Sequence, residues 1–137
     1  FSILLVSLLS ACNTEPDPIN YGLDQCVFCE MTIVDKSHSA VLVSSKGKSF
    51  KFDAIECMVR YMNRNEMNDY AFILVTDFSN PGVLTEAVNG YFLITPEIPS
   101  PMGANLSAFQ SKTDVLSMQE SKGGELLKWK EIMERFK

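Results

Sequence analysis

Short apolar runs separated by polar, turn-forming segments are the dominant pattern of this chain, and they predict a small mixed domain. Residues 40–43 (AVLV) are continuously apolar and predict a strand, and residues 49–52 (SFKF) alternate with a period of two. The polar turn between these two runs predicts a β-hairpin. Asp53 can then cap a helix over about residues 54–65, with Glu56 completing a weak capping box.

A second series of apolar runs follows the first helix. We expect strands at 70–75, 90–95 and 125–129, a turn at 79–82, and helices at 113–122 (with Thr113 as N-cap) and 130–136. Residues 50–58 and 127–133 share an order of aromatic, charged and apolar positions, and each stretch reads as a strand that leads into a helix. We therefore predict an α+β fold of two small ββα-type halves, about 23–67 and 70–137, packed as one compact unit.

The N-terminal residues read as a targeting segment. Residues 1–9 are apolar apart from two serines and too short to span a bilayer, and small residues precede Cys12. We expect residues 1–11 to be a lipoprotein signal peptide, Cys12 to be lipidated, and the Pro-containing residues 12–22 to form a flexible tether. The alternative is a buried N-terminal strand with a structural cysteine.

Length and charge narrow the function classes. Once the signal is removed, the remaining length suits one compact domain or two very small ones, and we expect one domain over residues 23–137. The formal net charge of −5 argues against nucleic acid as a partner. Three of the four cysteines remain after Cys12 is assigned to lipid, and an odd number fits free metal ligands better than a disulfide framework.

Three sulfur side chains fall within six residues at the start of the predicted domain. Cys26 and Cys29 are spaced so that both sulfurs can reach one ion from a tight turn, and Met31 adds a thioether. Thiolates with a thioether suit Cu(I) better than Zn(II). The alternatives are a redox pair, which is expected at a helix N-terminus, and incidental core cysteines.

Cys57 is the third candidate thiol. It falls in the first turn of the predicted helix, after the hairpin, where the helix dipole favours a thiolate. A cysteine knuckle, a hairpin and a cysteine at a helix start are also typical of a treble-clef zinc module. Such a module needs a further ligand where this chain has Arg60, so a structural Zn(II) site is one ligand short. The alternative is a small buried core residue.

Met102 and His38 complete the candidate ligands. Met102 lies on a loop stiffened by prolines and not on a helical stripe, whereas the other methionines after Met31 stand at helical positions and are expected in the core. His38 is the only histidine, and its imidazole suits copper or zinc; the alternative is an exposed side chain in a polar stretch. No acid–base pair, nucleophilic set or phosphate-binding loop is present, so we expect a protein that is not an enzyme.

The chain resembles the NosL family of lipoprotein accessory factors for nitrous oxide reductase. The similarity is carried by the lipobox ending at Cys12, by Cys29-Glu30-Met31 and by residues 100–103 (SPMG), and it is supported by residues 105–109 (NLSAF). The resemblance implies a fold of two ββα-type halves and a site that binds Cu(I) outside the cytoplasm. It also implies delivery of copper to nitrous oxide reductase, with an ABC-type transporter complex as a second partner.

The chain departs from the family pattern at three positions. Glu30 stands where the family usually has glycine, and Lys36 stands where many members have a histidine, with His38 near but not equivalent. Cys26 is shared with only a subset of the family.

Three functions from different classes compete at this point. The first is a membrane-anchored, extracytoplasmic Cu(I) metallochaperone with Cys29 as the principal ligand and Cys26 as a secondary one. The second is a thiol–disulfide oxidoreductase that uses Cys26 and Cys29. The third is an anchored binding domain stabilised by Zn(II).

Overall fold

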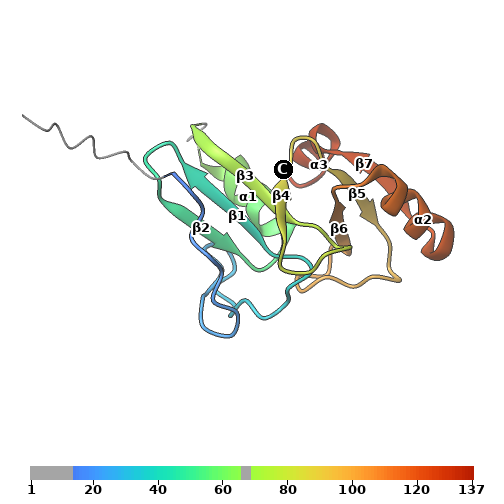
Figure 1. Ribbon diagram of the computed structural model, residues 1–137, viewed down its shortest axis with the longest axis horizontal. Coiled ribbons are helices and arrows are strands. Elements are labelled where there is room, and N and C mark those ends of the chain that lie inside the picture. The colour runs from blue at the N-terminus through green and yellow to red at the C-terminus, as the bar shows by residue number, and fades with distance from the viewer. Residues whose placement is uncertain (1–13, 66–68) are drawn as a thin grey trace, which may run out of the picture.

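Two antiparallel sheets lie side by side in the computed structural model, which describes residues 14–65 and 69–137 (Figure 1). The larger sheet has the strand order β2-β1-β3-β4, and the smaller sheet has the order β6-β5-β7. In chain order the elements are β1 (Ala40–Ser44), β2 (Ser49–Phe52), α1 (Ile55–Arg64), β3 (Tyr70–Thr76), β4 (Leu84–Glu86), β5 (Tyr91–Ile94), β6 (Leu106–Phe109), α2 (Lys112–Lys122), β7 (Glu125–Lys128) and α3 (Trp129–Arg135).

Strand β1, one of the two inner strands of the larger sheet, is buried on both faces. Successive side chains of a strand point to opposite faces, so Leu42 faces the core that α1 covers, and Val41 and Val43 face the other side. There they pack with Leu74 and with Ile19 from the N-terminal segment. This explains why the sequence of β1 is continuously apolar instead of alternating.

The smaller sheet also buries both faces. Phe92 of β5 belongs to the main core and stacks against Trp129, with ring centroids 5.9 Å apart. Its neighbour Leu93 points the other way, into a second core where it packs with Val115 of α2. Helix α1 therefore covers the larger sheet and α2 covers the smaller sheet. Helix α3 packs between α1 and the smaller sheet.

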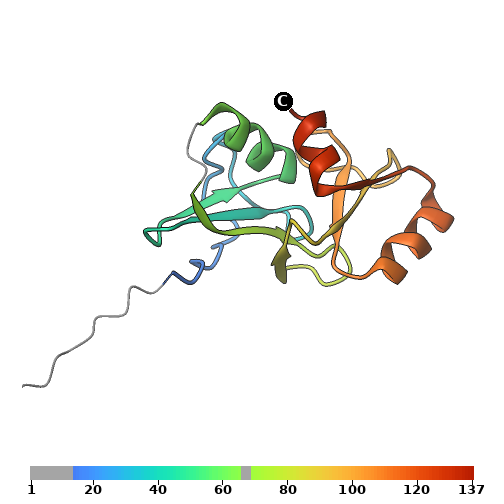
Figure 2. The same cartoon turned by 90° about the horizontal axis from the view of Figure 1, so that it is seen from above.

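Several contacts join the two sheets into one body. Figure 2 shows α1 and α3 side by side on one side of the molecule. The Asn63 amide donates to the carbonyl oxygens of Met133 and Phe136 at 3.1 and 3.3 Å. At the opposite side, the N–H of Phe78 donates to the carbonyl of Ala108 at 2.8 Å. The main hydrophobic core accordingly contains residues from both sheets.

The predicted α+β class is confirmed, and the β1–β2 hairpin lies at the predicted residues. Both of the strand-to-helix stretches that resemble each other are present, as β2–α1 and β7–α3. Strands β4 and β6 were not predicted. The proposed division between halves is also wrong in one respect, because β3 and β4 follow α1 in the chain but belong to the larger sheet.

Both predicted helix caps are wrong. The N-cap of α1 is Ala54 and not Asp53, and it has no side-chain cap bond. Glu56 forms no capping box, because its carboxylate is buried in contacts with residues 100 and 104. The N-cap of α2 is Ser111 and not Thr113; its hydroxyl accepts from the N–H of Asp114 at 3.3 Å.

The segment expected to be a flexible tether contacts the larger sheet over its described part. Ile19 packs on that sheet, the N–H of Asp17 donates to the Ser49 hydroxyl at 2.9 Å, and Tyr21 shares a hydrogen bond of 2.9 Å with Ser39. The predicted signal peptide and Cys12 lie outside the described residues. Within residues 14–65 and 69–137, no helix has the length and apolar content needed to cross a bilayer.

Candidate metal centre

Residues 25–32 form a tight turn, which we call the knuckle. Its ends are joined by an antiparallel bridge between Gln25 and Thr32, and the N–H of Cys26 donates to the carbonyl of Met31 at 2.8 Å. The turn is closed by the N–H of Glu30, which donates to the carbonyl of Cys26 at 2.9 Å. A further bond of 3.0 Å, from the N–H of Val27 to the carbonyl of residue 51, attaches the knuckle to β2. The knuckle is therefore fixed to the sheet that leads into α1.

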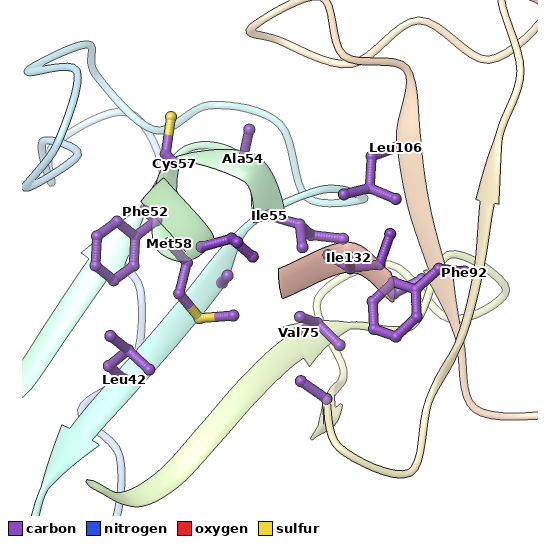
Figure 3. Close-up of a cluster of buried hydrophobic side chains, with 14 of the residues drawn as sticks. Leu42, Phe52, Ala54, Ile55, Cys57, Met58, Val75, Phe92, Leu106 and Ile132 are labelled. Atoms are coloured by element: carbon purple, nitrogen blue, oxygen red, sulfur yellow. The ribbon is translucent and has the colours of Figure 1, made fainter. Parts of the chain in front are cut away.

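Cys57 enters the same site from the first turn of α1. Figure 3 shows that its sulfur and that of Met58 leave the helix in opposite directions, with Met58 pointing toward Leu42. Cys57 is fully buried, with an exposed fraction of 0%. Strand β2 is hydrogen-bonded to the knuckle and leads directly into α1. The thiol of Cys57, at the start of α1, therefore lies close to those of Cys26 and Cys29 in the knuckle.

The sulfurs of Cys26, Cys29 and Cys57 all lie within 4.8 Å of one another, and we call this group the thiol cluster. The three residues are free cysteines; Cys26 and Cys57 are buried, and Cys29 is partly exposed. Three sulfurs at this separation could hold one metal ion. The cluster is therefore closed toward the core and open toward solvent on the side of Cys29.

Hydrogen bonds that converge on the sulfur of Cys26 favour its thiolate. The largest effect comes from the thiol of Cys57, which donates to it. Backbone N–H groups add to this, and that of Cys29 lies 3.4 Å from the sulfur. These bonds outweigh burial and lower the pKa of Cys26 to about 5. The same contact with Cys26 raises the pKa of Cys57, so Cys57 is the protonated partner.

The remaining thiol and a nearby carboxyl are shifted in the opposite direction from Cys26. Burial raises the pKa of Cys29. Burial, together with the negative charge of Cys26, raises the pKa of Asp53 to about 6. The Asp53 side chain is 5% exposed, and its Oδ1 has no hydrogen-bond partner among the described residues. At neutral pH the cluster thus holds one thiolate, two thiols and an adjacent carboxylate.

Met31 and Met102 both have exposed side chains, with fractions of 59% and 40%. Met31 lies within the knuckle, and the N–H of Cys26 donates to its carbonyl. Met102 lies in the loop of residues 96–105, which we call the methionine loop, within a turn closed by a bond of 3.0 Å from the N–H of Gly103 to the carbonyl of Ser100. The expectation that helical methionines are core residues is confirmed for Met58, which is fully buried. Three others are partly buried and pack against the cores: Met62, Met118 and Met133. Met67 lies outside the described residues.

The structure does not bring His38 into the thiol cluster. Its side chain is buried, contrary to the alternative of an exposed histidine, and its Nδ1 lies 3.2 Å from both carboxylate oxygens of Asp35. Its Nε2 lies 3.1 Å from the hydroxyl of Ser107 on β6. This Asp–His–Ser order is that of a hydrolase triad, but Ser107 is 0% exposed, so no substrate can reach its hydroxyl. The arrangement instead joins the segment after the knuckle to the smaller sheet.

Glu56 and Asp53 are the site residues that sequence reasoning missed, because both were assigned to helix capping. The signal was present in the apolar neighbours of Glu56 (AIECMV), which leave a carboxylate inside a run that is buried throughout. Arg60, which stands where a treble-clef module needs its further ligand, stacks on the ring of Phe136 instead.

Comparisons with known proteins bear on the fold and the family of this chain. No curated protein matches the chain. The crystal structure of the copper chaperone NosL from Shewanella denitrificans has a similar fold, with a TM-score of 0.74 and 19% sequence identity over 87% of this chain and 96% of that one. The family model of NosL matches residues 21–136, which is most of the sequence. This chain therefore belongs to the NosL family.

Proposed function

We propose that this protein is a Cu(I) metallochaperone that binds its ion at the thiol cluster and releases it by ligand exchange. The observation that carries this proposal is the group of three sulfurs within 4.8 Å, of which one is accessible from solvent. Cys26, Cys29 and Cys57 are the proposed thiol ligands. Met31 and Met102 are the proposed thioether ligands.

The donor set favours Cu(I) over Zn(II). Structural zinc in proteins almost always has four ligands in a tetrahedral arrangement, and the thiol cluster supplies three. Among the described residues, no histidine or carboxylate joins the group as a fourth ligand. Soft thiolate and thioether ligands suit Cu(I), for which a set completed by methionine is favourable.

The unequal exposure of the thiols suits transfer of an ion. Cys26 and Cys57 form the buried side of the thiol cluster, whereas Cys29 and the neighbouring Met31 are accessible to solvent. A ligand from an acceptor protein can therefore approach on the exposed side. Loading displaces the protons of Cys29 and Cys57, because metal ligands must be deprotonated, and only Cys26 has a lowered pKa.

The same arrangement disfavours a thiol–disulfide oxidoreductase. The attacking sulfur of such an enzyme must be both ionised and accessible. Here the ionised thiol is Cys26, which is only 2% exposed, and the accessible thiol is Cys29, whose pKa is raised. No cysteine of the cluster combines the two properties.

Family membership supports the cellular setting that we propose. The protein would be anchored to a membrane through lipidated Cys12, outside the cytoplasm, and nitrous oxide reductase and its ABC-type maturation complex would be its partners. The test is transfer of copper from the loaded protein to copper-free nitrous oxide reductase, measured by recovery of the reductase's copper absorption. Retention of the copper by the chaperone under these conditions would contradict this client.

Competition with a Cu(I) chelator tests the ligand assignment. We expect Cys29→Ser to weaken Cu(I) binding more than Cys26→Ser, because Cys29 is the thiol next to Met31 and the one shared across the family resemblance. Metal content after purification under reducing, copper-replete conditions separates the three functional classes: copper for the chaperone, zinc for a zinc-stabilised domain, and no metal for an oxidoreductase. Unchanged Cu(I) binding in both variants would contradict the proposal.

A further inference from the structure

A buried carboxylate links α1 to the methionine loop. Glu56 lies in the first turn of α1, next to Cys57, and has an exposed fraction of 0%. Its Oε1 accepts from the Ser100 hydroxyl at 3.1 Å and from the N–H of Ala104 at 3.3 Å. Both donors belong to the methionine loop, so one carboxylate oxygen holds that loop on both sides of Met102.

The loop is also closed upon itself at the same place. The Ser100 hydroxyl accepts from the N–H of Asn105 at 2.9 Å while it donates to Glu56. The turn bond from Gly103 to Ser100 completes the closure. The backbone around Met102 is therefore fixed relative to α1, although the Met102 side chain is 40% exposed.

Burial of Glu56 has no evident benefit for stability alone. A carboxylate removed from water is costly unless its oxygens find partners, and Oε2 of Glu56 has none among the described residues. No lysine or arginine forms an ion pair with Glu56 in residues 14–65 and 69–137. What Glu56 does provide is a direct link that fixes the position of the turn around Met102 relative to the first turn of α1, which carries Cys57.

We propose that Glu56 is a positioning residue for the copper site, which holds the Met102 turn against the start of α1 so that the thioether and the thiol cluster can reach one ion. This inference rests on the proposed function, because it assumes that Met102 is a ligand. Fixing the loop before binding lowers the entropy that is lost when the ion is bound. Glu56 would act through Met102 and would not itself touch the metal.

A double-mutant cycle tests the inference by chelator competition for Cu(I). We expect Met102→Leu and Glu56→Ala each to weaken Cu(I) binding by about fivefold, and the double variant to be little weaker than either single one, because both changes remove the same contact. Glu56→Gln keeps the acceptor oxygen and should retain wild-type affinity. Additive losses, or a Glu56→Gln variant as weak as Glu56→Ala, would overturn the positioning role.

Asp77→Ala is the matched control, because Asp77 is also a buried carboxylate. It is 2% exposed and accepts from residues 79, 80 and 110, none of which belongs to the thiol cluster or to the methionine loop. We expect Asp77→Ala to lower the melting temperature without changing Cu(I) affinity. An equal loss of Cu(I) affinity in Asp77→Ala would show a general effect of destabilisation and overturn the inference.

Ser100→Ala provides a second route if Glu56→Ala does not fold. This variant removes only the hydroxyl between Glu56 and Asn105, and it should also weaken Cu(I) binding; unchanged affinity would overturn the inference. If Met102→Leu weakens binding but the Glu56 and Ser100 variants do not, the positioning role is wrong and the proposed function stands. If Met102→Leu itself has no effect, the thioether part of the proposed function is wrong, and the inference falls with it.

Discussion

Glu30 adopts a backbone conformation that favours glycine. Its φ is 65°, and among the described residues the only other non-glycine residue with a positive φ is Asn105. The left-handed region brings Cβ close to the following carbonyl oxygen, and only glycine avoids this cost. The knuckle needs this turn to return the chain from Cys29 to β-type structure, which gives a physical reason for the glycine that the family usually has at this position.

We predict that Glu30→Gly stabilises the protein by about 0.5 kcal/mol, because the relief of strain exceeds the added freedom of the unfolded chain. Urea unfolding of the metal-free protein would measure the difference. The side chain of Glu30 is exposed, so the substitution leaves no buried group unpaired. A lower unfolding free energy for the glycine variant would mean that the carboxylate makes a stabilising interaction.

Asp53 gives a pH-dependent prediction. Its pKa is raised to about 6, first by burial and then by the charge of Cys26. A carboxyl with a raised folded-state pKa contributes stability below its unfolded pKa near 4, and that contribution is lost as the pH rises through about 6. The asparagine of Asp53→Asn cannot ionise, so its unfolding free energy does not have this loss. The unfolding free energy of the variant minus that of the wild type should therefore increase by about 2 kcal/mol from pH 4 to pH 7.5.

The measurement is the free energy of unfolding of both proteins at several pH values, with the metal removed. Asp17→Asn is a suitable control, because the side chain of Asp17 is exposed. A constant difference between Asp53→Asn and the wild type across this range would contradict the raised pKa.

At the scale of elements, the buried His38 connects the segment after the knuckle to the smaller sheet. His38 bonds to Asp35 on the knuckle side and to Ser107 of β6 on the other, at 3.2 and 3.1 Å. We predict that Ser107→Ala destabilises the protein by about 1 kcal/mol and that His38→Ala destabilises it by about 3 kcal/mol, since the latter also leaves a cavity. Thermal unfolding of both variants and of the double variant would measure the coupling between the two residues.

A further variant, His38→Gln, decides whether His38 binds copper. Both ring nitrogens of His38 are engaged in this chain, so His38→Gln should keep the Cu(I) affinity of the wild type. A marked loss of affinity in the folded His38→Gln variant would show that the histidine leaves its partners to bind the ion.

The elements differ in how well their sequences predict them. The β1–β2 hairpin was predictable because SFKF alternates and a polar turn precedes it. Strand β6 (LSAF) was not, because it is buried on both faces and contains small residues, so neither alternation nor β-propensity marks it. The cap of α2 was missed because both Ser111 and Thr113 are good N-cap residues, and tertiary packing decides between them.

In the candidate site, too, local structure could be predicted from the sequence and contacts between distant residues could not. The spacing of Cys26 and Cys29 alone places their sulfurs together, because a tight turn is a local structure. The approach of Cys57 depends on how β2 holds the knuckle beside α1, and this contact is not encoded in any spacing. The contact of Glu56 with a loop more than forty residues later was even less accessible to sequence reasoning.

At the scale of the whole molecule, the last two predictions concern the proposed lipid anchor and the proposed bridging of segments by one ion. We predict that Cys12 is acylated, because the apolar residues and small residues before it form a lipobox. The wild type should then remain with membranes, and Cys12→Ala should be released. Cell fractionation together with intact-mass measurement would check this. Equal retention of both forms, without acyl mass on the wild type, would contradict the prediction.

The two exposed methionines give the last prediction, in which one ion bridges distant parts of the chain. The knuckle reaches the first turn of α1 through the thiol cluster, and the methionine loop reaches it through Glu56. Met31 and Met102 therefore stand on two segments that converge on one helix end. Thioethers add no charge, so they favour Cu(I) while leaving it exchangeable.

Replacing both Met31 and Met102 with leucine should preserve folding, because this swap is nearly volume-neutral. It should lower Cu(I) affinity by at least about tenfold, or about 1.4 kcal/mol, and barely change Zn(II) affinity. Met118→Leu is the matched control, since Met118 packs in the second core. Chelator competitions with each metal would separate these effects. Unchanged Cu(I) binding in the double variant would show that the site is formed by the thiols alone.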